Sequence, residues 1–341
     1  MMAKINLKHR SWYEVKDKLS SFLFILPAVT IFAVFYVYPF FETFNLSLRD
    51  WNGIGPAKLF VGFRNFSDIL SLMASQQPAD LTWWQSVIYW LKSLAAGTLS
   101  LNYDEVWWRS VWHASYITLV ALTFQNALAF MLAMACDREI RGKHFYRAVF
   151  FIPPVLSEVV VGLIWKWILE GGVQNGQHYG LLNHCLDVVG LHHLVNDWLS
   201  DPKTALTCIA VVHSWKGFGW GFLMFLAGLQ TIDRELYEAA KVDGAGAWRT
   251  FWNITVPMML PVIIVVVILT ILGSMQAFVL ILSMTDGGPG YHTEVPVTRI
   301  LAAMMRTKEF GYACAMGVTF GAILIALSAA LKKMESRIKR I

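Results

Sequence analysis

Two charged side chains lie within long apolar stretches of this sequence. Glu158 lies in residues 148–169 and Lys216 in residues 204–232. If each stretch is a helix, Glu158 is about 15 Å from one end and Lys216 about 18 Å from the other, near the middle of a bilayer core of about 30 Å. A charge at that depth is costly and usually faces a cavity or an opposite charge. We therefore expect both residues to lie at a similar depth and to line or adjoin a polar cavity.

Polar and aromatic residues in the same stretches suit a hydroxylated solute such as a sugar. Carboxylates, ammonium groups and amides hydrogen-bond to hydroxyls, and aromatic rings pack against the C–H faces of a sugar ring. The alternative is a charge pair that only neutralises itself, with aromatic side chains that only fill space. The candidate solute contacts are Gln125, Asn126, Glu158, Trp215, Lys216, Trp220, Gln276 and Phe278, with Trp165 as a further stacking surface.

The composition favours a membrane protein. Of the 341 residues, 56% are hydrophobic and 15% are charged, whereas soluble domains have about 25% charged residues. The net charge of +5 comes from short basic clusters. Such clusters are typical of topology determinants rather than of a nucleic-acid surface, so we expect a lipid membrane and no nucleic acid among the partners.

Cysteine and histidine are not arranged for metal or redox chemistry. The four cysteines are far apart and form no Cys-x-x-Cys pattern, so we expect neither a disulfide framework nor a metal site. His113 and His213 lie in apolar stretches without a matching ligand cluster, which favours packing or hydrogen bonding. No cleavable signal peptide is evident at the start of the sequence.

Six stretches are long and apolar enough to cross a bilayer as helices, which takes about 20 residues each. Lipid offers the backbone no hydrogen-bond partners, so these stretches must satisfy their own polar groups as helices. They are residues 21–41, 111–136, 148–169, 204–232, 256–285 and 312–331. The sequence therefore predicts an all-α polytopic membrane protein with six transmembrane helices.

Basic residues gather on one side of these spans. Lys and Arg are dense in both tails and in the second and fourth connections, and sparser in the long connections on the other side. The positive-inside rule then places both termini in the cytoplasm. The expected parts are a tail at 1–20, the first span with a long outer loop at 21–110, a core of five spans at 111–331 that includes a cytoplasmic loop at 233–257, and a basic tail at 332–341.

The loop at residues 233–257 interrupts the apolar sequence with charged side chains. Residues 234–241 are good helix formers, Asp243-Gly244 is a turn signal, and Pro257 stands near the start of the next span, where its missing N–H costs least. We predict a helix, a tight turn, a second helix and re-entry into the membrane. The apolar face of the second helix would comprise Ala247, Phe251 and Ile254. Such a helical pair can fit the cleft of a soluble partner; the alternative is an ordinary solvated loop.

The stretch "EAAKVDGAGAWRTFWNITVP" resembles the EAA loop of ABC-type import permeases. The family pattern is Glu-Ala-Ala, then Gly, then a hydrophobic residue and Pro, matched here by Glu238, Ala239, Ala240, Gly244, Ile254 and Pro257. Further family elements occur in order as "VGFRNF" (61–66), "YRAVFFIP" (146–153), "LIWKWIL" (163–169), "YGLLNHCL" (179–186) and "MTDGGPGYHT" (284–293). With "LAGLQTIDRELYEAAKVDGA" (226–245), the sequence is similar to the carbohydrate subgroup, of the MalF and UgpA kind.

This resemblance implies the type I ABC importer fold, with a cytoplasmic EAA coupling helix. It implies a permease subunit, not an enzyme, of an ATP-driven importer for a sugar, oligosaccharide, polyol or related glycoside. The EAA loop would dock on a cytoplasmic ATPase that holds ATP and Mg, with no cofactor in this chain, which lacks a GxxxxGK[ST] phosphate loop. The coupling residues would be Glu238, Ala239, Ala240, Asp243, Gly244, Ile254 and Pro257.

The resemblance also implies an assembly and a location. The chain would pair with a second, MalG-like permease, two copies of the ATPase and an external solute-binding protein. It would be a multi-pass protein of the inner (plasma) membrane of a bacterium or archaeon. The residues alone leave two other classes of membrane protein possible. A secondary carrier energised through Glu158 would work without ATP, and a membrane enzyme using His113 and His213 would copurify with a cofactor.

One segment departs from the family pattern. The Trp-rich residues 67–104 look inserted, because the family usually has a shorter link there. Wound as a helix, residues 83–94 place Trp83, Trp84 and Trp90 on one apolar face. That run is too short to span a bilayer, and Trp prefers the membrane–water interface. We expect an amphipathic helix on the outer membrane surface; the alternative is a lid segment packed under the binding protein.

Overall fold

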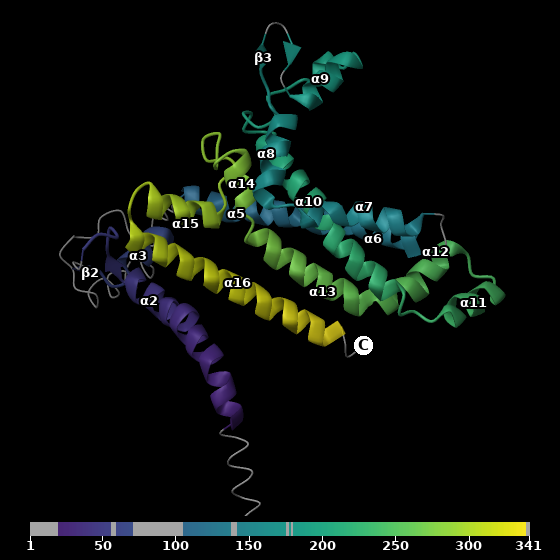
Figure 1. Ribbon diagram of the computed structural model, residues 1–341, viewed down its shortest axis with the longest axis horizontal. Coiled ribbons are helices and arrows are strands. Elements are labelled where there is room, and N and C mark those ends of the chain that lie inside the picture. The colour runs from purple at the N-terminus through teal and green to yellow at the C-terminus, as the bar shows by residue number, and fades with distance from the viewer. Residues whose placement is uncertain are drawn as a thin grey trace, which may run out of the picture.

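The structure is a computed structural model that describes residues 20–55, 59–70, 105–137, 142–174, 177–178 and 180–338. The predicted amphipathic run at 83–94, and most of the 67–104 segment, lie outside these residues. The described chain is almost entirely helical (Figure 1). Two short antiparallel ladders accompany the helices: β1 (Arg49–Asp50) with β2 (Leu59–Phe60), and β3 (Val173–Gln174) with β4 (Gln177–His178).

Within the described residues, five helical runs are long and apolar enough to cross a membrane, or six if the bent pair of helices described below is one span. The five are Ser20–Ser47, Val106–Asp137, Ala205–Leu229, Ala247–Met275 and Phe310–Ser336. The first includes η1 (Ala33–Val37) and α2 (Tyr38–Ser47), and the second joins α5 (Glu105–Val120), η2 (Ala121–Gln125) and α6 (Asn126–Asp137). The third is α10 (Ala205–Leu229), the fourth joins α12 (Ala247–Thr250), η4 (Phe251–Thr255) and α13 (Val256–Met275), and the last is α16 (Phe310–Ile338). The all-α fold with apolar spans is therefore confirmed.

The predicted span at 148–169 is not one helix. It is divided into α7 (Lys143–Val155) and α8 (Glu158–Ile168), whose axes differ by 96°. Pro153 and Pro154 occupy the last turn of α7 and supply no backbone N–H. The backbone then becomes extended, with ψ of 141° at Leu156 and 139° at Ser157. The expectation of a continuous helix here is wrong because this proline pair ends it, and α8 departs steeply from the other helices (Figure 1).

The predicted span at 256–285 needs correction at its end. α13 begins at Val256 as predicted but ends at Met275, and a separate α14 (Val279–Met284) follows. No proline marks the break at residues 276–278. Tertiary packing accounts for the break instead, because α14 leaves the direction of α13 and lies along α8 (Figure 1). Tertiary contact thus overrides an apolar pattern that would otherwise continue as one helix.

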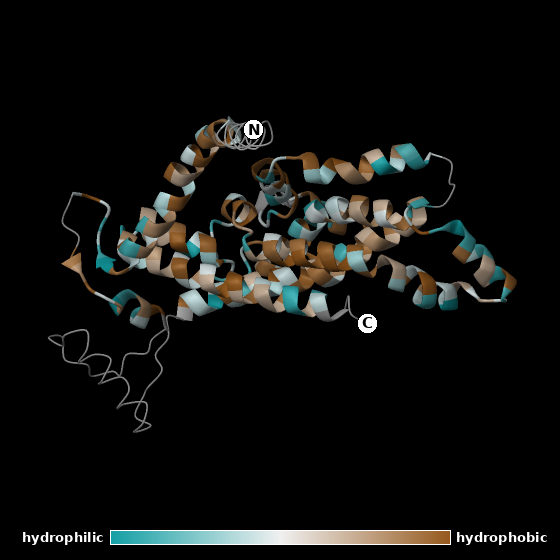
Figure 2. Cartoon of the chain, turned by 90° about the horizontal axis from the view of Figure 1, so that it is seen from below, coloured by the Kyte–Doolittle hydropathy of each residue, from teal (hydrophilic) through white to brown (hydrophobic). Residues whose placement is uncertain are grey.

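Shorter elements form the other connections. α3 (Arg64–Leu70) and α15 (Pro296–Met305) lie at the end of the bundle opposite the 233–257 loop, and α9 (Leu181–Val188) projects beyond α8 (Figure 1). The short η3 (His192–Leu194) follows α9. Buried Asn183 fastens the α9 arm: the Trp198 Nε1 donates to its Oδ1 at 2.7 Å, and its Nδ2 donates to the Asn196 carbonyl at 2.9 Å. Figure 2 shows hydrophobic residues along the middle of the long helices and hydrophilic residues toward both ends.

The core is organised around α10, which contacts α5, α6, α7 and α13. Three glycines at alternate positions allow this close packing. Gly217 and Gly221 face η2 and α6, where an added Cβ would meet Gln125 and Ala129, and Gly219 faces α7, where it would meet the Phe150 carbonyl and the Pro154 ring. Small residues let helix backbones approach within a membrane, where van der Waals packing largely drives association. We infer that these glycines fix α10 between α6 and α7.

This packing predicts different outcomes for two Gly→Ala substitutions. Gly219→Ala should lower stability by about 1–3 kcal/mol, because the methyl group has no space beside rigid backbone and a proline ring. Gly273→Ala is the matched control: it lies in α13 with nothing within 4 Å of an added Cβ, so it should be neutral or stabilise by up to about 1 kcal/mol. The melting temperature of the purified protein in detergent reports both. Equal melting temperatures for the two variants would contradict this assignment.

Candidate functional site

The 233–257 loop begins with a well-capped helix, α11 (Arg234–Val242). The Asp233 side chain accepts a hydrogen bond from the Glu235 N–H at 3.1 Å and so satisfies one of the free donors at the helix N-terminus. Ile232, just before the helix, is buried in an apolar cluster of the bundle, and Tyr237 of the helix packs against that cluster. The predicted first helix of the loop is therefore confirmed.

Gly244 ends α11 in the left-handed conformation, with φ of 74°. The Ala245 N–H bonds to the Ala240 carbonyl at 2.9 Å, and the Gly244 N–H bonds to the Lys241 carbonyl at 3.1 Å. This pair of bonds is the Schellman motif, in which glycine is preferred because it has no Cβ. Nothing lies within 4 Å of an added Cβ at Gly244. Any cost of a side chain there would come from the backbone conformation alone.

The predicted second helix is present as α12. It continues through η4 into α13, so that Ala247–Met275 is one helical run. The predicted order of helix, turn and second helix is confirmed, and the structure adds that the second helix joins the following span without a gap. Pro257 has no N–H to bond to residue 253, and the π turn η4 lies immediately before α13, where the ladder is already irregular. The loop helix is thereby a direct extension of a transmembrane helix.

The seven predicted coupling residues differ in exposure. Glu238, Ala239, Asp243 and Gly244 are exposed, Ala240 is buried, Ile254 is partly buried and Pro257 is exposed. Val242 and Trp248, on either side of the turn, are also exposed, at 88% and 74%. Sequence reasoning missed these two. In the sequence, Trp248 directly follows Ala247 and so lies off the predicted apolar face of Ala247, Phe251 and Ile254. An aromatic side chain outside that face was the signal that could have identified it as exposed.

Glu158 and Lys216 meet at the 96° bend. The Lys216 Nζ lies 3.7 Å from the Glu158 Oε1, with side-chain exposures of 17% and 43%. Lys216 lies in the middle of α10, and Glu158 is the first residue of α8. The expectation of a similar depth is confirmed by this contact, whereas contact with a solute stays a prediction.

The candidate aromatic residues have different surroundings. Trp215 packs edge-on against Trp165 at 5.5 Å between ring centroids and contributes to the core. Trp220, one turn after Lys216, is 63% exposed, with its ring 6.2 Å from that of Phe151. Trp220 is therefore the aromatic candidate most open to a solute.

Gln276 and Phe278 lie in the break between α13 and α14. The Gln276 Nε2 donates to the Leu272 carbonyl at 3.2 Å and the side chain is exposed, whereas Phe278 is partly buried against the core. The break thus leaves Gln276 accessible and engages Phe278 in packing.

Gln125 and Asn126 lie inside the helix packing, at the end of η2 and the start of α6. Both are buried, and the Asn126 Oδ1 accepts from the Thr270 Oγ1 of α13 at 3.1 Å. The Gln125 side chain covers Gly217 of α10. The Gln125 Oε1 and Asn126 Nδ2 have no partner among the described residues. These amides therefore lie where α6, α10 and α13 meet. Their contact with a solute remains a prediction.

The two membrane histidines are hydrogen-bonded. The His113 Nδ1 lies 2.8 Å from the Glu294 carbonyl, and the His213 Nε2 lies 3.0 Å from the Ser274 Oγ. The described part of the chain brings no three His, Cys, Asp or Glu residues together in a metal-binding arrangement. The interpretation of these histidines as hydrogen-bonding residues is confirmed.

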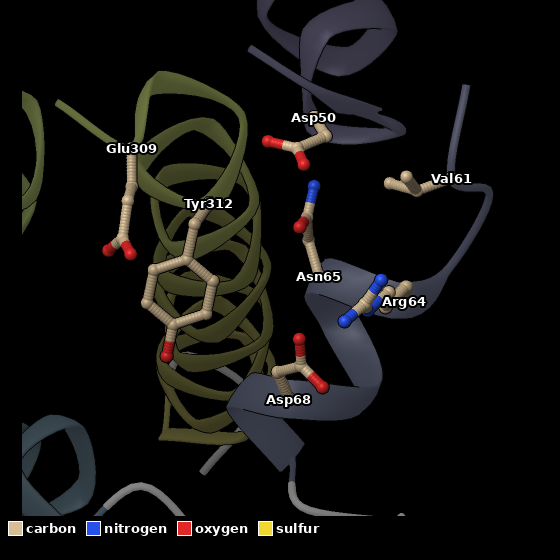
Figure 3. A pocket seen from close by; sticks show the side chains of 7 residues that line it. All are labelled: Asp50, Val61, Arg64, Asn65, Asp68, Glu309 and Tyr312. Atoms are coloured by element: carbon tan, nitrogen blue, oxygen red, sulfur yellow. The ribbon is translucent and has the colours of Figure 1, made fainter. Parts of the chain in front are cut away.

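A pocket of about 340 Å³ lies away from all the predicted site residues, between β1, α3 and the start of α16 (Figure 3). It is lined by Asp50, Val61, Arg64, Asn65, Asp68, Glu309 and Tyr312. Burial raises the pKa of the Asp68 carboxyl, and the charge of Arg64 partly opposes that shift. Asn65 Nδ2 donates to the Ser47 and Arg49 carbonyls, so this residue joins α3 to the end of the first span.

Comparison with protein families and individual proteins gives concordant matches. Residues 125–340 match the family described as the binding-protein-dependent transport system inner membrane component. The chain is 29% identical over 92% of its length to a probable ABC transporter permease, YurN, of Bacillus subtilis, covering 94% of that protein. It is 30% identical over 92% of its length to the diacetylchitobiose uptake system permease NgcF of Streptomyces coelicolor, covering 81% of that protein.

A solved structure shares the fold. A chain of a bacterial ABC transporter involved in the import of the acidic polysaccharide alginate aligns with a TM-score of 0.71, covering 96% of this chain and 99% of that one. The two sequences are 21% identical. At this identity the match shows a common fold and no more.

The loop geometry predicts that removing the hydroxyl group of Tyr237 changes the stability of α11 measurably. The Tyr237 OH lies 3.2 Å from the Thr255 Oγ1 and joins α11 to the helix that enters the membrane. Tyr237→Phe removes a bond worth about 1 kcal/mol, so amide hydrogen exchange in residues 234–242 should accelerate roughly fivefold. Tyr291→Phe, at an exposed tyrosine, is the control and should leave that exchange unchanged. Unaltered exchange in Tyr237→Phe would show that the hydroxyl does not hold α11.

Proposed function

This chain belongs to the family of binding-protein-dependent transport system inner membrane components, and we propose that it carries a sugar, oligosaccharide, polyol or related glycoside across the membrane. It is the permease subunit of an ABC importer and not an enzyme. The observation that carries the proposal is the family match over residues 125–340 together with the similarity to a permease for diacetylchitobiose uptake. The apolar spans supply the membrane-embedded part.

ATP hydrolysis takes place on separate ATPase subunits, which hold ATP and Mg. The exposed side of α11 docks on such a subunit, with Glu238 meeting basic ATPase residues and Val242 and Trp248 filling apolar contacts around the turn. The exposure of these side chains supports this assignment. Because α12 runs into α13 without a break, closure of two ATPase subunits moves α13 directly.

The solute passes along the side of α10 on which Lys216 and Trp220 lie. The Glu158–Lys216 pair offers hydrogen-bonding groups at the bend, and Trp220 offers an exposed ring to the C–H face of a sugar. A second, MalG-like permease completes the pathway, and an external solute-binding protein delivers the solute. Both termini lie in the cytoplasm, as the distribution of Lys and Arg favours. Transport follows alternating access, in which the docked loops draw together as the outer side opens.

The two other classes are less well supported. A secondary carrier needs no docking loop, whereas residues 233–257 form an exposed capped helix with a conformationally required glycine. An enzyme built on His113 and His213 would need these side chains free, whereas both are hydrogen-bonded within the bundle. The transport function is tested by ATP-dependent uptake of radiolabelled diacetylchitobiose and other small glycans into proteoliposomes that contain the purified complex. Uptake of no glycan would contradict it.

The coupling role predicts that two loop substitutions uncouple transport. Gly244→Val forces a β-branched residue to φ of 74° and should cost about 1–2 kcal/mol locally, and Glu238→Lys reverses an exposed charge. Both should lower solute-stimulated ATPase activity and transport at least about tenfold, with the membrane helices still folded. Gly246→Ala is the control, because Gly246 has φ of −71° and open space around it. Full coupled turnover in the two loop variants would refute the docking assignment.

A further inference from the structure

Glu158 and Lys216 are close enough to attract each other but are not hydrogen-bonded. Their nitrogen and oxygen are 3.7 Å apart, whereas a charge-assisted N–H···O bond is about 2.7–2.9 Å long. Neither side chain makes a hydrogen bond to any other residue in the part of the chain that the structure describes. The ammonium group therefore keeps its donors free, and the carboxylate keeps its acceptors free.

The positions of the two groups suit their opposite charges. Glu158 lies in the first turn of α8, where the positive end of the helix dipole attracts a carboxylate. Lys216 is largely buried, and a buried ammonium group needs an opposite charge nearby. Each residue thus supports the charge of the other across a short gap.

Among the described residues, the helices packed around the pair contribute no further formal charge near it. Residues 111–136, 250–275 and 310–331 contain no Asp, Glu, Lys or Arg, and Lys216 is the one charged residue of α10. Lys166 lies near the far end of α8 and is exposed. His213, one turn before Lys216, is engaged with Ser274. The net charge around the pair is therefore zero.

We propose that the Glu158–Lys216 pair makes this permease selective for uncharged carbohydrates over acidic ones. Lys216 donates to one hydroxyl of the solute while Glu158 accepts from a neighbouring hydroxyl, so a neutral diol spans the pair. A uronic acid brings an extra negative charge to a site whose net charge is zero, so no free positive charge there offsets the cost of desolvating its carboxylate. The inference rests on the proposed function and specifies its substrate class.

The fold alone does not determine this preference. A transporter of the acidic polysaccharide alginate has the same fold, so discrimination by charge must come from individual side chains. In a pathway with low dielectric constant, an uncompensated charge changes the free energy of the bound solute more than any single hydrogen bond does. A charge pair that is already neutral, with no free cation beside it, thus disfavours anionic solutes.

The experiment measures ATP-dependent uptake by proteoliposomes containing the whole complex with its binding protein. The probes are diacetylchitobiose, maltose, cellobiose and galactobiose, and for each of these the counterpart oxidised to the uronic acid at C6. The measured quantity is the ratio of neutral to acidic uptake. Because every variant uses the same binding protein, a change in this ratio comes from the permease.

The wild type should favour the neutral member of each transported pair. Glu158→Gln should lower the ratio at least about tenfold, which corresponds to about 1.4 kcal/mol of differential interaction, by releasing the Lys216 charge for the uronate. Lys216→Met should lower neutral uptake without gaining acidic uptake. Lys166→Gln is the control: it removes a charge from α8, the helix of Glu158, at a position away from the pair, and should leave the ratio unchanged.

Complex assembly is checked by gel filtration. If Glu158→Gln does not assemble, the double variant Glu158→Gln/Lys216→Met, which retains neutrality, replaces it and should bring the ratio toward one. An unchanged ratio in the assembled variant, or a wild type that prefers uronic acids, overturns this inference and leaves the carbohydrate function intact. Uptake of no glycan in either form overturns both.

Discussion

Close packing of α10 against its neighbours is the interaction on which the rest of the structure depends. In a bilayer, lipid tails are as apolar as the side chains, so helices are held by dispersion at short range rather than by escape from water. Gly217, Gly219 and Gly221 place α10 against η2, α6 and α7. Both apolar clusters of the core include residues of α10. Displacing this one helix would therefore open the whole bundle.

The same packing positions the charge pair. Gly219 lies three residues after Lys216, and the Pro154 ring that it contacts lies four residues before Glu158. The contact between α10 and α7 thus fixes the place at which α7 ends and α8 turns away. The turn brings the Glu158 carboxylate to 3.7 Å from the Lys216 ammonium. A purely steric contact thereby determines where two charges meet in the membrane.

Features that depend on local chemistry could be predicted from the sequence. The apolar spans follow from hydropathy, and the turn at Gly244 follows from a residue that tolerates positive φ. The meeting of Glu158 and Lys216 follows from the cost of isolated charges. Features set by tertiary contact could not be predicted. The break after Met275 has no breaker residue, and the glycines of α10 show their role only when their neighbours are known.

The uninterrupted run from Ala247 to Met275 has a mechanical consequence. Its 29 residues correspond to a rod of about 43 Å at 1.5 Å per residue. A continuous helix transmits a tilt along its length, so displacing one end about an interior contact moves the other end in the opposite direction. Tilting it by a few degrees displaces one end by several ångströms while the close contact at α10 acts as a fulcrum. The π turn at Phe251–Thr255 and the internal Pro261 both weaken its regular hydrogen bonding, and bending at these positions would lower the displacement that reaches the far end.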